Sequence, residues 1–211
     1  MAALMFIGAI VLGYLLGAIP FGVIASKLSR GIDVREHGSG SMGTTNVLRT
    51  AGTGAAVFVL LADVVKGAAA VGVAWGIFAS RPDMFAWGLM AGGAAAVVGH
   101  NWPVYIGFRG GRGIATSFGA LLVMSWPAGL ICLAIFIVTV AASRYVSLGS
   151  VLGATALLVM MIALYFLNLE PLAYLIFAVI IVPVVVIRHW GNIKRLRAGT
   201  ERKIGQKVEV A

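Results

Sequence analysis

Two glycine-rich segments carry the residues best suited to binding an anion. The first runs from Glu36 to Arg49, reads EHGSGSMGTTNVLR, and places Gly38, Gly40 and Gly43 within six residues. Glycine permits the positive φ angles at which successive backbone N–H groups converge on an anion, and neighbouring hydroxyls can add hydrogen bonds. The segment lacks a Gly-Lys-Ser/Thr ending and follows no predicted strand, which excludes a Walker loop and a dinucleotide fingerprint. It therefore predicts a phosphate cradle, with a plain flexible loop as the alternative.

The second glycine-rich segment covers residues 108–116 and reads FRGGRGIAT. Its glycines are Gly110, Gly111 and Gly113, and its arginines are Arg109 and Arg112. It opens directly into a predicted helix N-terminus, whose dipole favours a bound anion. A loop that only sets membrane orientation needs arginines but no glycines, so an anion site is favoured here.

Further polar residues stand beside the later apolar runs. Residues 143–150 read SRYVSLGS and offer an arginine and hydroxyls at the start of a predicted helix. His189 and Asn192 follow the last apolar run, and one helical turn of spacing would place them on one face. There they could orient a substrate hydroxyl, although a lone interfacial histidine is more often only a hydrogen-bonded surface residue.

Asp63 and Lys66 stand three residues apart inside a long apolar run. Charged side chains are costly in hydrocarbon, so both are expected to face the interior of a helix bundle. A structural ion pair and a role in holding a substrate phosphate are both open for this pair.

The sequence lacks the residues that several known types of reaction require. Tyr105 stands five positions after His100, where acyl-CoA-dependent glycerolipid acyltransferases have an aspartate. There is no Gly-x-Ser-x-Gly elbow, zinc-type cluster or run of acidic metal ligands, and Cys132 is the only cysteine. We therefore expect no disulfide, no metal and no cofactor, and a site that binds anions without a nucleophile of its own.

The composition indicates that lipid is part of the solvent. Of 211 residues, 61% are hydrophobic and 11% charged, and the mean hydropathy is +1.02, more apolar surface than a soluble core could bury. The first apolar run lacks a basic start and a cleavage site, which favours a retained helix over a signal peptide. The net charge of +9 lies at loop ends without interleaved aromatic residues, which argues against nucleic acid as a partner.

The apolar runs predict an all-α, polytopic membrane bundle. Since a helix needs about 20 residues to cross about 30 Å of hydrocarbon, the expected spans are residues 3–26, 54–79, 84–106, 114–125, 128–143, 147–168 and 171–190.

The stretch 114–143 decides the number of crossings. If this stretch is one helix, the chain crosses the membrane six times. If it is a hairpin with a short, tilted or re-entrant first arm, the chain crosses seven times. Seven crossings gather nearly all loop arginines and lysines on one side and leave only Arg81 on the other. The positive-inside rule then predicts an N-terminus outside and a C-terminus in the cytoplasm, with a polar tail that frays beyond Lys203.

Together these motifs resemble the acyl-phosphate-dependent glycerol-3-phosphate acyltransferases of bacteria, the PlsY family. The matching stretches are Gly38 to Arg49, Asp63 with Lys66 and Gly67, Gly99 to Thr116, Arg144 to Ser150, and His189 to Glu201. The resemblance implies seven membrane helices and an active site on the cytoplasmic face of the inner membrane. It implies acyl transfer from acyl phosphate to the sn-1 hydroxyl of glycerol 3-phosphate, the first acylation of phospholipid biosynthesis. Acyl phosphate is already activated, so positioning can replace a nucleophile of the protein.

The resemblance also implies the site residues. The expected catalytic core is Ser39, Arg49, Arg112, Ser150, His189 and Asn192. Expected substrate or phosphate contacts are Gly38, Gly40, Gly43, Thr45, Asn46, Lys66, Gly110, Gly111, Gly113 and Arg188. In this hypothesis, Arg49 and Arg112 hold phosphates, glycine N–H groups donate to them, and the proton of the attacking hydroxyl passes to His189 or to a substrate phosphate.

The chain departs from the family pattern at two positions, with Arg112 where the family usually has Lys and Ser41 where it usually has Asn. Arginine keeps its proton, so a role at position 112 must be electrostatic or through bidentate hydrogen bonds. Expected partners are membrane lipid and a soluble enzyme that forms acyl phosphate, and the chain is expected to be a monomer. An anion transporter and an acyl-CoA-dependent acyltransferase remain as alternatives.

Overall fold

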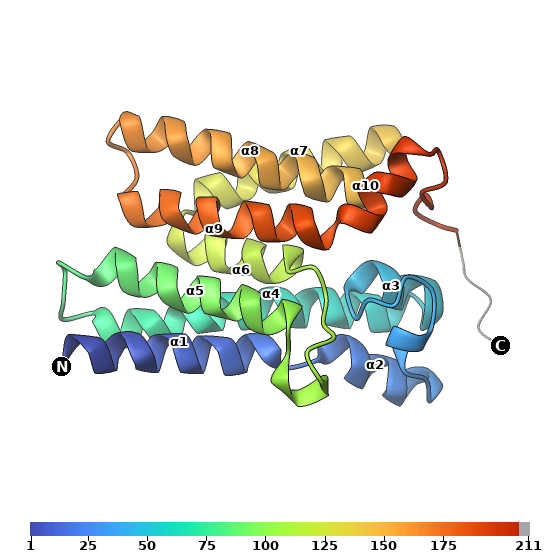
Figure 1. The fold of residues 1–211 in the computed structure, drawn as a ribbon, viewed down its shortest axis with the longest axis horizontal. Helices are drawn as coiled ribbons and strands as arrows, with labels where there is room; N and C mark the ends of the chain where they lie inside the picture. Colours follow the sequence, from blue (N-terminus) through green and yellow to red (C-terminus); the bar gives the residue numbers. More distant parts are fainter. Residues whose placement is uncertain (207–211) are drawn as a thin grey trace.

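The computed structural model describes residues 1–206, and every regular element in this part of the chain is a helix (Figure 1). The elements are α1 (Ala2–Ala18), α2 (Phe21–Arg30), η1 (Val34–Glu36), α3 (Thr44–Thr50), α4 (Thr53–Phe78), α5 (Phe85–Asn101), η2 (Val104–Ile106), α6 (Ile114–Met124), α7 (Trp126–Ser143), α8 (Val146–Phe166), α9 (Leu172–Arg188) and α10 (Trp190–Arg197).

The long helices lie side by side as a bundle, with both glycine-rich segments at the end opposite the N-terminus (Figure 1). Four helical stretches in the described chain are long and apolar enough to cross a membrane, namely Ala2–Arg30, α4, α7 and α8. The bent pair α9 and α10 adds a fifth candidate, and α6 is a shorter apolar helix. The all-helical, membrane-type fold predicted from the sequence is confirmed.

Several helix boundaries differ from the predicted ranges. The run 3–26 forms two helices, because the chain breaks at Ile19 and Pro20, and proline supplies no N–H to continue the hydrogen-bond ladder. α5 ends at Asn101 rather than at 106, just before Trp102 and Pro103. The stretch 114–143 forms two helices, α6 and α7, that meet at Ser125.

The largest difference lies at the end of the last apolar run. A continuous helix over 171–190 was predicted, but α9 ends at Arg188 and the chain turns by 56° into α10. The segment predicted as a polar tail is thus a helix as far as Arg197, and it returns toward the bundle up to Glu201. Fraying was predicted beyond Lys203, but the N–H of Ile204 donates to the carbonyl of Arg144 at 2.8 Å, and Lys207 and the residues after it lie outside the described residues.

Small residues let the helix backbones approach closely at the site end of the bundle. A side chain at Gly17 of α1 would overlap the carbonyl oxygen of Ala96 in α5, and one at Gly99 of α5 would overlap that of Tyr14 in α1. The pair α4 and α6 has the same construction, in which Gly67 lies against the backbone of Thr116. Such contacts are how membrane helices gain packing energy without a hydrophobic driving force. They hold α4, α5 and α6 rigidly beneath the glycine-rich segments.

Candidate active site

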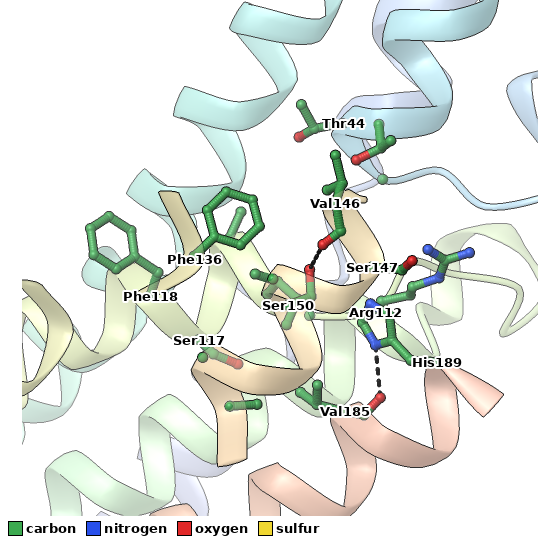
Figure 2. A pocket seen from close by; sticks show the side chains of 18 of the residues that line it. Thr44, Arg112, Ser117, Phe118, Phe136, Val146, Ser147, Ser150, Val185 and His189 are labelled. Carbon is green, nitrogen blue, oxygen red and sulfur yellow. Dashed lines mark hydrogen bonds between the residues drawn. The ribbon is translucent and has the colours of Figure 1, made fainter. Parts of the chain in front are cut away.

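A cavity of about 370 Å³ opens beneath the glycine-rich segments. All six residues predicted as the catalytic core line it: Ser39, Arg49, Arg112, Ser150, His189 and Asn192. Away from them the lining becomes apolar, with Leu60 of α4, Phe118 of α6, Phe136 of α7 and Leu157 of α8. Figure 2 shows Phe118 and Phe136 at this apolar part and Arg112, Ser147 and His189 at the polar part.

A second cavity, of about 260 Å³, adjoins the first and shares Ser39, Ser41, Arg112 and Asn192 with it. The remaining residues of its wall are Gly40, Gly110, Arg188, Gly191 and Arg195, so it has no large apolar side chain. Of the predicted phosphate contacts, Gly43, Thr45, Asn46 and Gly113 line the first cavity, Gly40, Gly110 and Arg188 line the second, and Gly38, Gly111 and Lys66 line neither.

The first glycine-rich segment is organised around the buried side chain of Asn46. Its Nδ2 donates to the carbonyl oxygens of Val34, His37 and Ser41 at 2.8–3.0 Å, and its Oδ1 accepts from the N–H of Ser39 at 2.9 Å. These bonds occupy the amide, so Asn46 holds the loop rather than the phosphate that was expected for it. Gly38 adopts φ +64° directly against Asn46, where a side chain would overlap Oδ1.

The second glycine-rich segment is held from two sides. Arg188 donates from Nε and Nη2 to Gly111 O and from Nη2 to Gly110 O, at 2.7–3.1 Å, and the N–H of Gly111 donates to the carbonyl of His100 at 3.0 Å. The expectation that Gly111 supplies a free backbone donor is therefore wrong. Arg188 is likewise committed to the loop carbonyls, which leaves Arg112 as the cation that this loop presents to the cavities.

Arg112 has no hydrogen bond or ion pair with any side chain or carbonyl of residues 1–206. Burial lowers the pKa of its guanidinium to about 10, so the group remains charged at neutral pH. Arg112 is half-buried, and a partly desolvated guanidinium without a partner gains when an anion joins it. Arg49, from the last turn of α3, donates to the carbonyl of Arg202 at 3.0 Å, and burial lowers its pKa as well. Both arginines thus form a positive wall that suits a phosphate.

His189 sits at the bend between α9 and α10 and is only 2% exposed. Its Nδ1 lies 2.8 Å from the carbonyl oxygen of Val185 (Figure 2). A carbonyl oxygen only accepts, so Nδ1 carries the proton and Nε2 of the neutral ring is an acceptor. Ser150 donates to the carbonyl of Val146 at 2.9 Å, which leaves its oxygen lone pairs beside the cavity.

Glu201 is a site residue to which the sequence assigned no role. Its Oε1 accepts from Ser147 at 2.8 Å and from Asn192 at 2.6 Å, and its Oε2 accepts from Arg195 at 2.7 Å. Burial raises the pKa of Glu201, but these three donors outweigh it and hold the pKa below its usual value. The only available signal was that Glu201 is one of two acidic residues within a basic tail. Glu201 joins α8 to α10 and fixes Asn192 at the cavity.

We expect Glu201→Ala to abolish most activity and to lower the melting temperature of the purified protein. The change would leave buried donors of Ser147 and Asn192 without an acceptor, at about 1–3 kcal/mol each. Because the pKa of Glu201 is lowered on folding, its stabilisation is present at neutral pH and is lost as the pH falls below the ordinary carboxyl range. The exposed Glu36→Ala is the matched control, and wild-type activity of Glu201→Ala would contradict this assignment.

The Asp63 and Lys66 pair is buried in the bundle. Nζ of Lys66 lies 2.8 Å from Oδ1 of Asp63 and donates to the carbonyl of Ile19 at 2.9 Å. Lys66 is therefore engaged in the ion pair rather than facing either cavity, which favours the structural alternative over phosphate binding. Asp63 and His100, by contrast, line the first cavity.

The first cavity is an apolar slot that ends in a wall of arginines, and it lies inside a membrane helix bundle. This combination defines the site of an enzyme that binds a lipid chain and a phosphate together. The chain belongs to the glycerol-3-phosphate acyltransferase family, whose sequence profile matches residues 7–199. It is an integral membrane acyltransferase of phospholipid synthesis.

Relatives of the same description cover almost the whole chain. A glycerol-3-phosphate acyltransferase of Nostoc sp. is 45% identical, over 95% of this chain and 93% of the relative. One from Halalkalibacterium halodurans is 44% identical, over 93% and 94%. The crystal structure of PlsY, an integral membrane glycerol 3-phosphate acyltransferase in its glycerol 3-phosphate form, matches with a TM-score of 0.85 and 34% identity, covering 95% of this chain and 96% of that one. Its lysophosphatidic acid form matches with a TM-score of 0.82 and 33% identity, over 95% and 96%.

Proposed function

We propose that this protein transfers a fatty acyl group from acyl phosphate to the sn-1 hydroxyl of glycerol 3-phosphate, forming lysophosphatidic acid and phosphate. The observation that carries the proposal is the half-buried Arg112, which has no hydrogen-bond or ion-pair partner in the described chain and borders both cavities. A phosphate in either cavity would supply its missing counter-charge. The crystallised glycerol 3-phosphate and lysophosphatidic acid forms of the related PlsY support this choice of acceptor and product.

The two cavities suit the two substrates differently. The first combines a polar end with an apolar slot between α4, α6, α7 and α8, as acyl phosphate requires. The second is lined by polar and glycine residues, with Arg112 as its uncommitted cation and the bonded Arg188 and Arg195 beside it, as suits a small water-soluble phosphate ester. The shared residues Ser39, Arg112 and Asn192 then lie where the two substrates meet, with His189 in the wall of the first cavity.

The reaction needs positioning more than covalent catalysis. The sn-1 hydroxyl oxygen attacks the acyl carbonyl carbon, the bond from that carbon to the phosphate oxygen breaks, and phosphate leaves with the electron pair. Arg49 and Arg112 offset the charge that develops on the phosphate and the carbonyl oxygen. The hydroxyl proton passes to Nε2 of His189 or to a phosphate oxygen. Holding the two substrates in line supplies the largest part of the rate.

We place the site at the cytoplasmic face of the bacterial inner membrane. The seven crossings would be α1 continued by α2, then α4, α5, α6, α7, α8 and α9, with the N-terminus outside and the C-terminus in the cytoplasm. The eleven residues of α6 extend only about 16 Å, so neighbouring helices must cover its ends. In this arrangement a monomer is complete, and a soluble enzyme that forms acyl phosphate is the supplier.

The proposal is tested with protein purified in lipid nanodiscs and given glycerol 3-phosphate with either acyl phosphate or acyl-CoA. We expect 1-acyl-glycerol 3-phosphate, identified by mass spectrometry and positional analysis, only from acyl phosphate, with one phosphate released per product molecule. Product from acyl-CoA alone would favour the acyl-CoA-dependent alternative. No product from either donor, together with phosphate uptake into proteoliposomes, would favour an anion transporter.

A further inference from the structure

Three buried ionisable side chains form a continuous row beneath the second glycine-rich segment. Lys66 and Asp63 of α4 are paired at 2.8 Å, and Oδ1 of Asp63 lies 3.5 Å from Nδ1 of His100 on α5. The exposed fractions of the three residues are 2–3%. The row begins at the Ile19 carbonyl, where α1 breaks, and ends at His100. The acyl transfer proposed above assigns no step to any of the three.

The segment around Arg112 rests on the end of α5, where His100 lies. A Cβ atom on Gly111 would overlap Nε2 of the His100 ring, and one on Gly110 would overlap the His100 carbonyl oxygen. A Cβ atom on Gly113 would approach Oδ1 of Asn101 to 3.0 Å. The N–H of Gly111 also donates to the carbonyl of His100. All three glycines around Arg112 therefore depend on the placement of residues 100 and 101.

We propose that Asp63 and His100 are positioning residues that set the place of Arg112 for phosphate binding. At 3.5 Å, the carboxylate of Asp63 attracts a proton on Nδ1 of His100, so it favours that tautomer and biases the orientation of the ring. The ring in turn packs against Gly111, while Arg188 donates to the carbonyl oxygen of the same residue. Lys66 keeps the charge of Asp63 balanced within the bundle. The proposal rests on the phosphate-binding role proposed for Arg112.

A simpler role for the pair is charge balance alone, and the two roles differ in a variant that removes both charges. Asp63→Asn by itself would leave Lys66 buried and unpaired, which is strongly destabilising. Asp63→Asn combined with Lys66→Met removes both charges and keeps the side-chain sizes. If the pair only balances charge, this double variant binds phosphate like the wild type. If Asp63 orients His100, binding stays weakened even though the protein is folded.

The experiment measures the affinity of the purified full-length protein in nanodiscs for inorganic phosphate by calorimetry, alongside turnover and melting temperature. We expect Asp63→Asn/Lys66→Met to melt close to the wild type and to bind phosphate about tenfold more weakly, a coupling typical of residues in contact. Added to Arg112→Gln, the same double change should alter the remaining affinity less than about twofold, because its effect passes through Arg112. Gly72→Ala in α4, where a Cβ atom meets nothing within 4 Å, is the control.

A second variant covers the case in which the double variant does not fold. Gly111→Ala inserts a methyl group between the loop and the His100 ring without changing any charge, and we expect it to weaken phosphate binding to a similar degree. Wild-type affinity in Asp63→Asn/Lys66→Met or in Gly111→Ala would overturn the proposal. The proposal would also be overturned if the loss of phosphate affinity in the Asp63→Asn/Lys66→Met variant multiplied with the loss in Arg112→Gln. It would likewise be overturned if the wild-type protein bound no phosphate. Phosphate binding without turnover would instead contradict only the proposed function.

Discussion

Replacing Arg112 by glutamine is expected to lower kcat/KM about a hundredfold to a thousandfold, the range seen when a donor to a developing negative charge is removed. Arg112 is the half-buried cation that borders both cavities, and it makes no ion pair within residues 1–206, because the Glu201 carboxylate that attracts it is already paired with Arg195. Its loss should therefore affect both phosphate-bearing substrates. Steady-state kinetics with each substrate varied in turn would show the effect, and the exposed Arg197→Gln is the matched control.

A lysine at position 112 tests how much geometry matters. Arg112→Lys keeps the charge but loses the planar, bidentate donor pair, so we expect a loss within about tenfold. Since burial lowers the pKa of Arg112 only to about 10, no loss of activity from its deprotonation is expected near neutral pH. Full activity of Arg112→Gln would contradict the central role given to this residue.

Replacing His189 by alanine is expected to lower kcat about a hundredfold to ten-thousandfold, as for the loss of a general base. The bond from Nδ1 to the Val185 carbonyl fixes the tautomer in which Nε2 can accept a proton. The measurement is turnover at saturating concentrations of both substrates, because a defect in substrate binding alone would disappear there. His37→Ala, which changes a histidine outside both cavities, is the control. Near-normal turnover of His189→Ala would assign the proton to a substrate phosphate.

The sequence predicted which residues meet, because hydropathy and the positive-inside rule assign motifs to one membrane face without knowledge of their contacts. Ser39, Arg112 and His189 come from distant parts of the chain, and they line one cavity as expected. Loops at one end of a small bundle have few other places to go, so motifs assigned to the same end meet there.

The sequence could not predict how the polar groups are divided between scaffold and site. In the sequence, Asn46 and Arg188 look as suited to binding phosphate as Arg112 does, yet the side-chain N–H groups of both donate to loop carbonyls. The hydrogen bond from Ser147 to Glu201 likewise depends on the 56° bend at His189, and no local sequence pattern predicts that bend. The pairings of Arg188 and Glu201 join residues 54 to 78 positions apart and follow from tertiary packing, and the Asn46 bonds, within 12 positions, follow from the folded loop rather than from local propensity.

The bond between Lys66 and the Ile19 carbonyl has a consequence for the order of assembly during biogenesis. Taken singly, α4 brings into the bilayer a cationic side chain with a spare donor, and the Ile19 carbonyl at the break of the first segment accepts from the Phe21 N–H at 3.1 Å and has room for a second donor. The spare donor of Lys66 is costly in lipid, and the Ile19 carbonyl removes that cost by accepting from it. The first and the second inserted segments therefore have a reason to associate before α5 arrives, so that later helices dock onto a pre-formed pair.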